Sequence, residues 1–242
     1  MPLVARRAVC VLACAVSACG ALGEPAREYE ETLELASDGS AAVDVNTSLA
    51  ALAVLRGAPV DPSAPVDLAA VGAFYEAPGV TVTDVEAFTR DGRAFVRVRV
   101  EASELTALSR SPGLAWSLYR LETGDDTLTF RQIVGRPPPD AATAATVAGW
   151  QGGERVAFRL RAPGEVLESN APDGLERGNC VVWEQPLPVR VRGGMVDLRV
   201  TMDDDPMLEQ ALTLFGVTVA LAALAFIVAV WWLVRRGRRA LP

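Results

Sequence analysis

Alternation of apolar and polar residues is the main pattern along the middle of this chain. It is cleanest over residues 196–202, where every second side chain is apolar and the others are charged or polar. A period of two residues is typical of a half-buried β-strand, because successive side chains point to opposite faces of a sheet. The same pattern predicts strands over 27–35, 94–100, 128–134 and 155–161.

Short turn sequences join these strands into hairpins. Aspartate, glycine and serine favour the tight turns that connect antiparallel strands. We expect three such hairpins, which pair 27–35 with 41–47 through 38–40, 80–88 with 94–100 through Asp91-Gly92, and 115–121 with 128–134 through 124–126.

Helical spacing of apolar residues is confined to three short stretches, 66–75, 103–108 and 140–148. Antiparallel hairpins combined with two or three short helices indicate an α+β fold. We therefore expect a single extracytoplasmic α+β domain over residues 27–205.

One residue breaks the alternation of the first predicted strand. Tyr29, Leu33 and Leu35 share one face of 27–35, and Glu31 falls on that same apolar face. The periodicity gives no reason for a carboxyl group at this position.

The N-terminus has the anatomy of a signal peptide. Arg6 and Arg7 precede an apolar run over 8–18, which is too short to cross ~30 Å of hydrocarbon as a helix. We therefore predict a lipoprotein-type signal peptide over 1–18 and a tether over 19–26.

The end of this run, Val16-Ser17-Ala18-Cys19, resembles the lipobox of bacterial lipoproteins. The resemblance implies that Cys19 becomes the new N-terminus and carries a diacylglycerol as its lipid attachment. The alternative is an ordinary signal peptide that is cleaved after Ala21, with no role for Cys19.

A second apolar block lies near the C-terminus. Residues 211–234 contain no charged side chain and give about 36 Å of helix, enough to cross a bilayer. Asp205-Pro206 fits a helix start. Arginines crowd the tail over 235–242, so the positive-inside rule places it in the cytoplasm. We therefore expect one transmembrane helix over 206–234 in the bacterial cytoplasmic membrane, with the domain outside.

Composition and charge exclude several classes of function. The chain has 30 acidic residues against 23 basic ones and contains no histidine. An acidic domain repels phosphate backbones, so we expect no nucleic-acid partner. Without histidine, Ser–His–Asp and Cys–His catalytic devices and the commonest metal ligand are missing. We therefore expect no enzymatic activity, no catalytic residue, no cofactor and no metal.

The positions of the cysteines also argue against disulfide chemistry in the central domain. Cys180 is the one cysteine of the central domain, because Cys10, Cys14 and Cys19 lie in the N-terminal block. A disulfide within the domain is therefore excluded. We expect Cys180 to act as a small buried hydrophobic residue.

Residues 162–187 have the most individual sequence. Its distinctive positions are Pro163-Gly164, Val166, Asn170, Gly178-Asn179 and Val182-Trp183. We expect a strand, a turn over 170–178 and a second strand. The pattern resembles the family typified by the mycobacterial lipoprotein LppM, as does the layout of signal, α+β domain and C-terminal helix. Residues 27–134 do not align with it. The resemblance implies a non-enzymatic envelope protein that binds lipids, and no catalytic residue carries over.

Trp183 has two interpretations. It could line an apolar groove that accepts a lipid, or it could be a core residue of a hairpin.

These patterns predict a membrane-anchored envelope lipoprotein with a non-catalytic domain. One hypothesis is that the domain binds lipid or glycolipid, which requires a continuous apolar cavity. The alternative is a scaffold or assembly factor for an envelope protein complex, which requires an exposed apolar patch or a protein partner.

Overall fold

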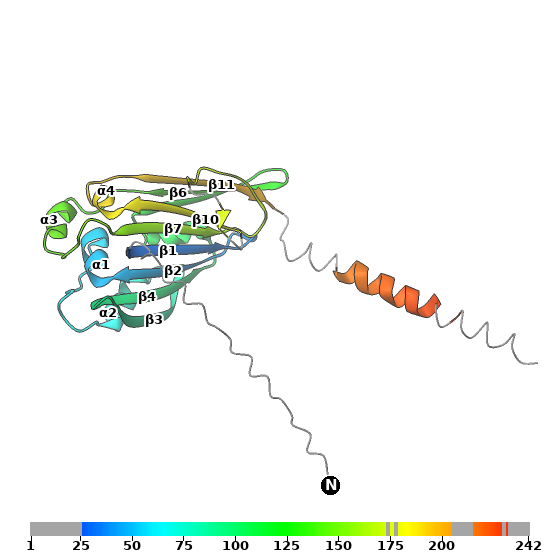
Figure 1. The fold of residues 1–242 in the computed structure, drawn as a ribbon, viewed down its shortest axis with the longest axis horizontal. Helices are drawn as coiled ribbons and strands as arrows, with labels where there is room; N and C mark the ends of the chain where they lie inside the picture. The colour runs from blue at the N-terminus through cyan, green and yellow to red at the C-terminus, as the bar shows by residue number, and fades with distance from the viewer. Residues whose placement is uncertain (1–25, 173–174, 177–178, 205–214, 229–230, 232–242) are drawn as a thin grey trace, which may run out of the picture.

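The computed structural model of the chain describes residues 26–172, 175–176, 179–204, 215–228 and 231. Two β-sheets form its main body, and short helices lie at the ends of the strands (Figure 1).

The larger sheet has the strand order β3-β4-β2-β1-β7-β10-β9. Its strands are β1 (Arg27–Leu35), β2 (Ala41–Ser48), β3 (Val80–Arg90), β4 (Arg93–Ala102), β7 (Arg155–Arg161), β9 (Leu175–Glu176) and β10 (Cys180–Pro186). All neighbouring strands are antiparallel except β1 and β7, which run parallel. The parallel contact places the first strand of the domain beside a segment from its second half.

The smaller sheet has the strand order β5-β6-β11-β8. Its strands are β5 (Ser117–Thr123), β6 (Thr127–Val134), β8 (Val166–Ser169) and β11 (Val196–Asp203), and all its pairs are antiparallel. Strands of the smaller sheet alternate along the chain with strands of the larger one, so the two sheets form one folding unit.

The helices are α1 (Leu49–Arg56), α2 (Leu68–Tyr75), the 3-10 helix η1 (Leu105–Arg110), α3 (Ala141–Ala145) and α4 (Leu187–Val191). Ser48 caps the start of α1, and its hydroxyl accepts the Ala51 N–H at 3.0 Å. Gly57, with φ 65°, caps the end. This left-handed conformation favours glycine and satisfies the last carbonyls of a helix. α1, α3 and α4 gather at one end of the strands (Figure 1).

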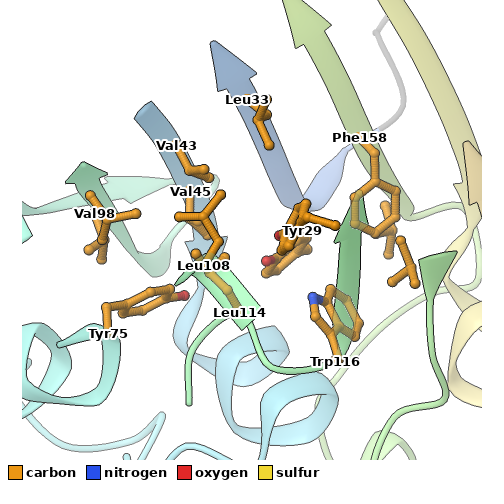
Figure 2. Close-up of a cluster of buried hydrophobic side chains, with 14 of the residues drawn as sticks. Tyr29, Leu33, Val43, Val45, Tyr75, Val98, Leu108, Leu114, Trp116 and Phe158 are labelled. Carbon is orange, nitrogen blue, oxygen red and sulfur yellow. The ribbon is translucent and has the colours of Figure 1, made fainter. Parts of the chain in front are cut away.

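The core lies between the inner faces of the two sheets. Val43 and Phe158 from the larger sheet and Phe130 and Val200 from the smaller one belong to the same buried cluster. Figure 2 shows side chains from several strands converging on Tyr29. Burying each large apolar side chain stabilises the fold by about 1.5–3 kcal/mol, so this shared core holds the sheets together.

The predicted hairpins are present as β1–β2, β3–β4 and β5–β6. Residues 162–187 behave differently. β8 joins the smaller sheet by pairing with β11, whereas β10 pairs with β7 in the larger sheet. The two longer strands of this segment therefore belong to different sheets and form no hairpin with one another, while the short β9, within the expected turn, pairs with β10.

The predicted fold class, α+β with a C-terminal transmembrane helix, is wrong. The domain is sheet-rich. Each of its helices is one or two turns long and lies near the ends of the strands. The short helices expected over 66–75, 103–108 and 140–148 are present as α2, η1 and α3, but most of the buried core residues belong to strands.

The spanning helix is overturned by a second observation. In the parts of the chain that the structure describes, no helix combines the length and apolar character needed to cross a membrane. Residues 206–214, 229–230 and 232–234 and the tail over 235–242 lie outside the described residues. The single-pass localisation in the cytoplasmic membrane is corrected on the same finding.

Close packing around Gly113 gives a test of the core. A Cβ atom added at Gly113 would lie 2.3 Å from Cδ1 of the fully buried Tyr75. We expect Gly113→Ala to lower the free energy of unfolding by about 1–3 kcal/mol, measured by chemical denaturation, because the ring has no room to retreat. Gly153→Ala is the control, since its Cβ would meet nothing within 4 Å. Equal effects of the two substitutions would contradict this packing.

Candidate functional site

A buried carboxyl group joins the two sheets. Glu31 on β1 is 1% exposed. Its Oε1 accepts the hydroxyl of Tyr119 and the Nε2–H of Gln132, both at 2.7 Å, and its Oε2 accepts the hydroxyl of Tyr29 at 2.9 Å. Both oxygens act only as acceptors, as in a carboxylate. The donors Tyr119 and Gln132 come from the smaller sheet, so these bonds link the layers.

The strand registers explain why these groups meet. Tyr119 on β5 lies opposite Gln132 on β6, and both side chains face the core. Gln132 also donates to the hydroxyl of Ser117 at 3.1 Å. We call Tyr29, Glu31, Ser117, Tyr119 and Gln132 the polar centre.

Two arginines stack on one indole beside the polar centre. The guanidinium carbons of Arg56 and Arg190 lie 4.2 and 4.3 Å from the ring of Trp116. Arg190 is fully buried and donates to the carbonyls of Gly135 and Gly194. Burial, followed by the nearby charge of Arg56, lowers the pKa of Arg190 to about 10. Stacking on an aromatic face and carbonyl acceptors offset part of the cost of burying these charges.

Trp116 also touches the polar centre directly. Its ring meets that of Tyr29 edge-on, with centroids 5.0 Å apart, and the indole nitrogen edge is turned toward Tyr29 (Figure 2). The aromatic and charged groups thus form one continuous layer between the sheets.

The polar centre is closed to solvent. Each of its five members is at most 2% exposed. Three open hollows lie elsewhere in the described structure, with volumes of about 680, 480 and 200 Å³. No member of the polar centre lines any of these three hollows. Both oxygens of the Glu31 carboxylate therefore accept hydrogen bonds from neighbouring side chains, and none of these three hollows reaches it.

The largest hollow lies at the end of strands β1 to β4. Its lining includes the carboxylates Glu34 and Glu101 together with Ala42, Gly79 and Ser103. The hollow is shallow and partly polar, which differs from the continuous apolar cavity that a lipid tail requires.

Strand β3 forms an open edge of the larger sheet. Among the described residues, β4 is its one strand neighbour. Near its start, the outward backbone groups are occupied, because the Val80 N–H donates to the Ala77 carbonyl at 2.9 Å and the Val82 N–H donates to Glu76 Oε1 at 3.0 Å. The register then shifts at Thr83, which is a bulge.

Beyond the bulge, the edge is open. Glu86 and Phe88 lie opposite Arg97 and Phe95 on β4. Since backbone groups alternate between the two sides of an antiparallel strand, the N–H and C=O groups of Val85, Ala87 and Thr89 face away from β4. We call residues 84–90 the open edge. Phe88, stacked on Phe95 with centroids 5.5 Å apart, is 39% exposed beside it.

Of the residues that the sequence pointed to, Trp183 and Cys180 lie in the described structure and Cys19 does not. Trp183 is 4% exposed and lies in the core, and its Nε1–H donates to Asn170 Oδ1 at 3.0 Å. None of the three hollows includes Trp183. Cys180 is buried, as expected. The lipid attachment at Cys19 stays a prediction, because residue 19 lies outside the described residues.

Sequence reasoning found one part of the polar centre and missed the rest. Glu31 was visible as the polar exception on an apolar face. Gln132 gave a similar signal on the alternation of 128–134, since it shares a face with Phe130 and Val134. Arg190 gave none, because its burial depends on a single-turn helix, α4.

Among solved structures, the chain shows a weak likeness to one lipoprotein domain. No protein-family model and no curated protein matches the chain. The folded domain of LppM from Mycobacterium tuberculosis, solved by NMR, is similar with a TM-score of 0.41 and 12% identity, over 76% of this chain and 94% of that chain. A likeness this weak assigns the chain to no family and implies no function.

The tyrosines provide a spectroscopic test of the closed centre. The chain has three tyrosines, Tyr29, Tyr75 and Tyr119. Burial raises the pKa of all three, and the Glu31 charge raises it further. An unfolded tyrosine loses its proton near pH 10. The stabilisation from these groups is therefore complete below about pH 10 and is lost as the pH rises further. We expect no tyrosinate absorbance until the protein unfolds in alkali, and a reversible titration near pH 10 in the native state would contradict this.

Replacing the central carboxylate should weaken the link between the sheets. We expect Glu31→Gln to lower the free energy of unfolding by about 2–3 kcal/mol in denaturant titrations, because an amide NH₂ would then face a hydroxyl or amide donor. Glu86→Gln on the exposed face is the control, with an expected change under about 0.5 kcal/mol. A neutral Glu31→Gln would show that the polar centre contributes nothing to stability.

Proposed function

We propose that this domain is a non-catalytic protein-binding module that receives an extended segment of a partner along the open edge of β3. The observation that carries the proposal is the open edge itself, a stretch of strand with a neighbour on one side only among the described residues. An extended peptide can add to such an edge by main-chain hydrogen bonds, which supply affinity, while side chains supply specificity.

The surroundings of the open edge favour one end of β3 and one kind of partner. The Ala77 bridge, the Glu76 side chain and the bulge at Thr83 close the first part of the strand, so an added segment fits along 84–90. Asp84 and Glu86 are exposed there, and Glu86 has only a 4.0 Å contact to Arg97. A partner strand with basic residues on this face and an apolar side chain against Phe88 would complement the edge.

The proposal of a non-catalytic role is supported by the polar centre. Glu31, a carboxyl group buried between the two sheets, accepts hydrogen bonds from three donors and lines none of the three hollows described above. Its geometry suits the joining of sheets.

Binding of lipid or glycolipid in a pocket has less support. The two larger hollows are open, with carboxylates among their lining residues, and the smallest holds about 200 Å³. Trp183, the candidate groove residue, lies in the packed core. The predicted acylation of Cys19 would place the protein-binding module in the bacterial envelope without any lipid pocket.

Proline at an outward-facing position tests strand addition. Ala87→Pro removes one N–H on the open edge and leaves the groups that pair with β4 in place, so the fold should survive. We expect a photo-crosslinker at Thr89 of the full chain, expressed in cells, to give a discrete product with an extended segment of a partner protein, identified by mass spectrometry. This product should fall at least about tenfold with Ala87→Pro.

Ala87→Val is the matched control, because it keeps the N–H and a strand-forming residue. Its crosslinking should equal that of the parent chain, and thermal unfolding should show that both variants are folded. Crosslinking that is insensitive to proline, or a crosslinked partner site that is helical, would refute strand addition.

A further inference from the structure

Three arginines lie side by side on the outer face of the smaller sheet. The register places Arg120 on β5 opposite Arg131 on β6, and Arg131 opposite Arg199 on β11. Directly opposite residues of an antiparallel pair have Cβ atoms ~5 Å apart. Arg120 and Arg199 are exposed, and Arg131 is half-buried between them. We call these three residues the arginine row.

Such a row is unfavourable for the fold alone. Like charges directly opposite one another destabilise a sheet, and an ordinary solvated face avoids them. The outer face of the larger sheet shows the usual arrangement. There, every arginine of the following set has a carboxylate within 4.0 Å: Arg27, Arg97, Arg99, Arg155, Arg159 and Arg161.

The arginine row has one such partner. Asp197 accepts two hydrogen bonds from Arg131, at 2.9 and 2.7 Å, and so fixes the central guanidinium. Within the described part of the chain, neither Arg120 nor Arg199 has a carboxylate within 4.0 Å. Glu122 also interacts with Arg131, and Asp197 interacts with Arg199 as well. Glu168 lies opposite Thr201 in the next cross-strand row, so the positive charge of the arginine row is partly balanced.

The backbone beneath the row is held in place from the core. Asn170 Oδ1 accepts the Arg199 N–H at 2.9 Å and the indole N–H of the buried Trp183 at 3.0 Å. The Asn170 amide donates to the Asp197 carbonyl at 2.7 Å. The strand that carries Arg199 and Asp197 is therefore anchored on both sides of the row, which limits the cost of ordering the site around a ligand.

We propose that the arginine row binds a phosphoryl group. Guanidinium groups form paired, charge-assisted hydrogen bonds to phosphate oxygens, and two uncommitted guanidiniums flank a fixed one here. The hydroxyls of Thr129 and Thr201 lie in the next cross-strand row and add neutral donors. The phosphoryl group comes from a lipid head group or from free phosphate.

Calorimetric titration of the full-length protein at low ionic strength tests this site. The probes are inorganic phosphate, dihexanoylphosphatidylglycerol and dihexanoylphosphatidylcholine, with both lipids below their micelle-forming concentrations. We expect saturable binding of phosphate or of the glycerol lipid, with Kd raised about tenfold in Arg120→Gln and in Arg199→Gln, and weakened by added salt.

Arg97→Gln is the matched control, because it removes the same charge from an exposed position on the larger sheet. Its Kd should stay within about twofold of the parent chain, and the salt-bridged Arg131 is left intact in all variants. Binding of phosphate alone assigns the site to the free anion, whereas binding of the glycerol lipid alone assigns it to a head group, and either result supports the proposal. Absence of saturable binding, equal weakening by Arg97→Gln, or equal binding of both lipids that Arg120→Gln leaves unchanged would overturn it.

Discussion

The hydrogen bonds to Glu31 are the constraint on which the two-sheet architecture depends. A carboxylate without partners would be expensive to bury, and here Tyr29, Tyr119 and Gln132 replace the water it loses. Two of these donors lie on the opposite sheet. They therefore compensate for burial of the carboxylate only when the two sheets pack in one register. A slip of one residue in β1 would turn Glu31 outward and its apolar neighbours with it. The polar centre therefore selects a single arrangement of a core whose apolar residues alone could pack in several ways.

The polar centre is closed to solvent, and both proposed binding surfaces lie on the outside of the sheets. The two outer faces differ in their charge arrangement. The larger sheet carries arginines beside carboxylates, which neutralise one another, and ends at the open edge of β3. The smaller sheet carries arginines beside arginines, with Asp197 as the partner of the central one. A strand edge and a cationic face offer different chemistry, the first to an extended polypeptide and the second to an anion. Both surfaces are held by rigid strands, which favours preorganised binding over induced fit.

The extent to which the sequence predicted the fold can be judged from particular elements. Three hairpins followed from alternation and turn residues, because both signals are local. The pairing of β1 with β7 could not be predicted in this way, because it is parallel and joins segments that share no local signal. The expected membrane helix over 206–234 rested on hydropathy alone, and no helix among the described residues has the length and apolar character to cross a membrane.

The sequence by itself determined which residues form strands, which side of each strand is apolar, and that a carboxyl group interrupts the apolar side of the first one. These properties repeat every second residue and need no partner to be visible. Only the tertiary structure decided what Glu31 bonds to, that Arg190 is buried against Trp116, and that Arg120, Arg131 and Arg199 stand in one row. Each of these depends on cross-strand register, which is set by packing between segments far apart in the chain.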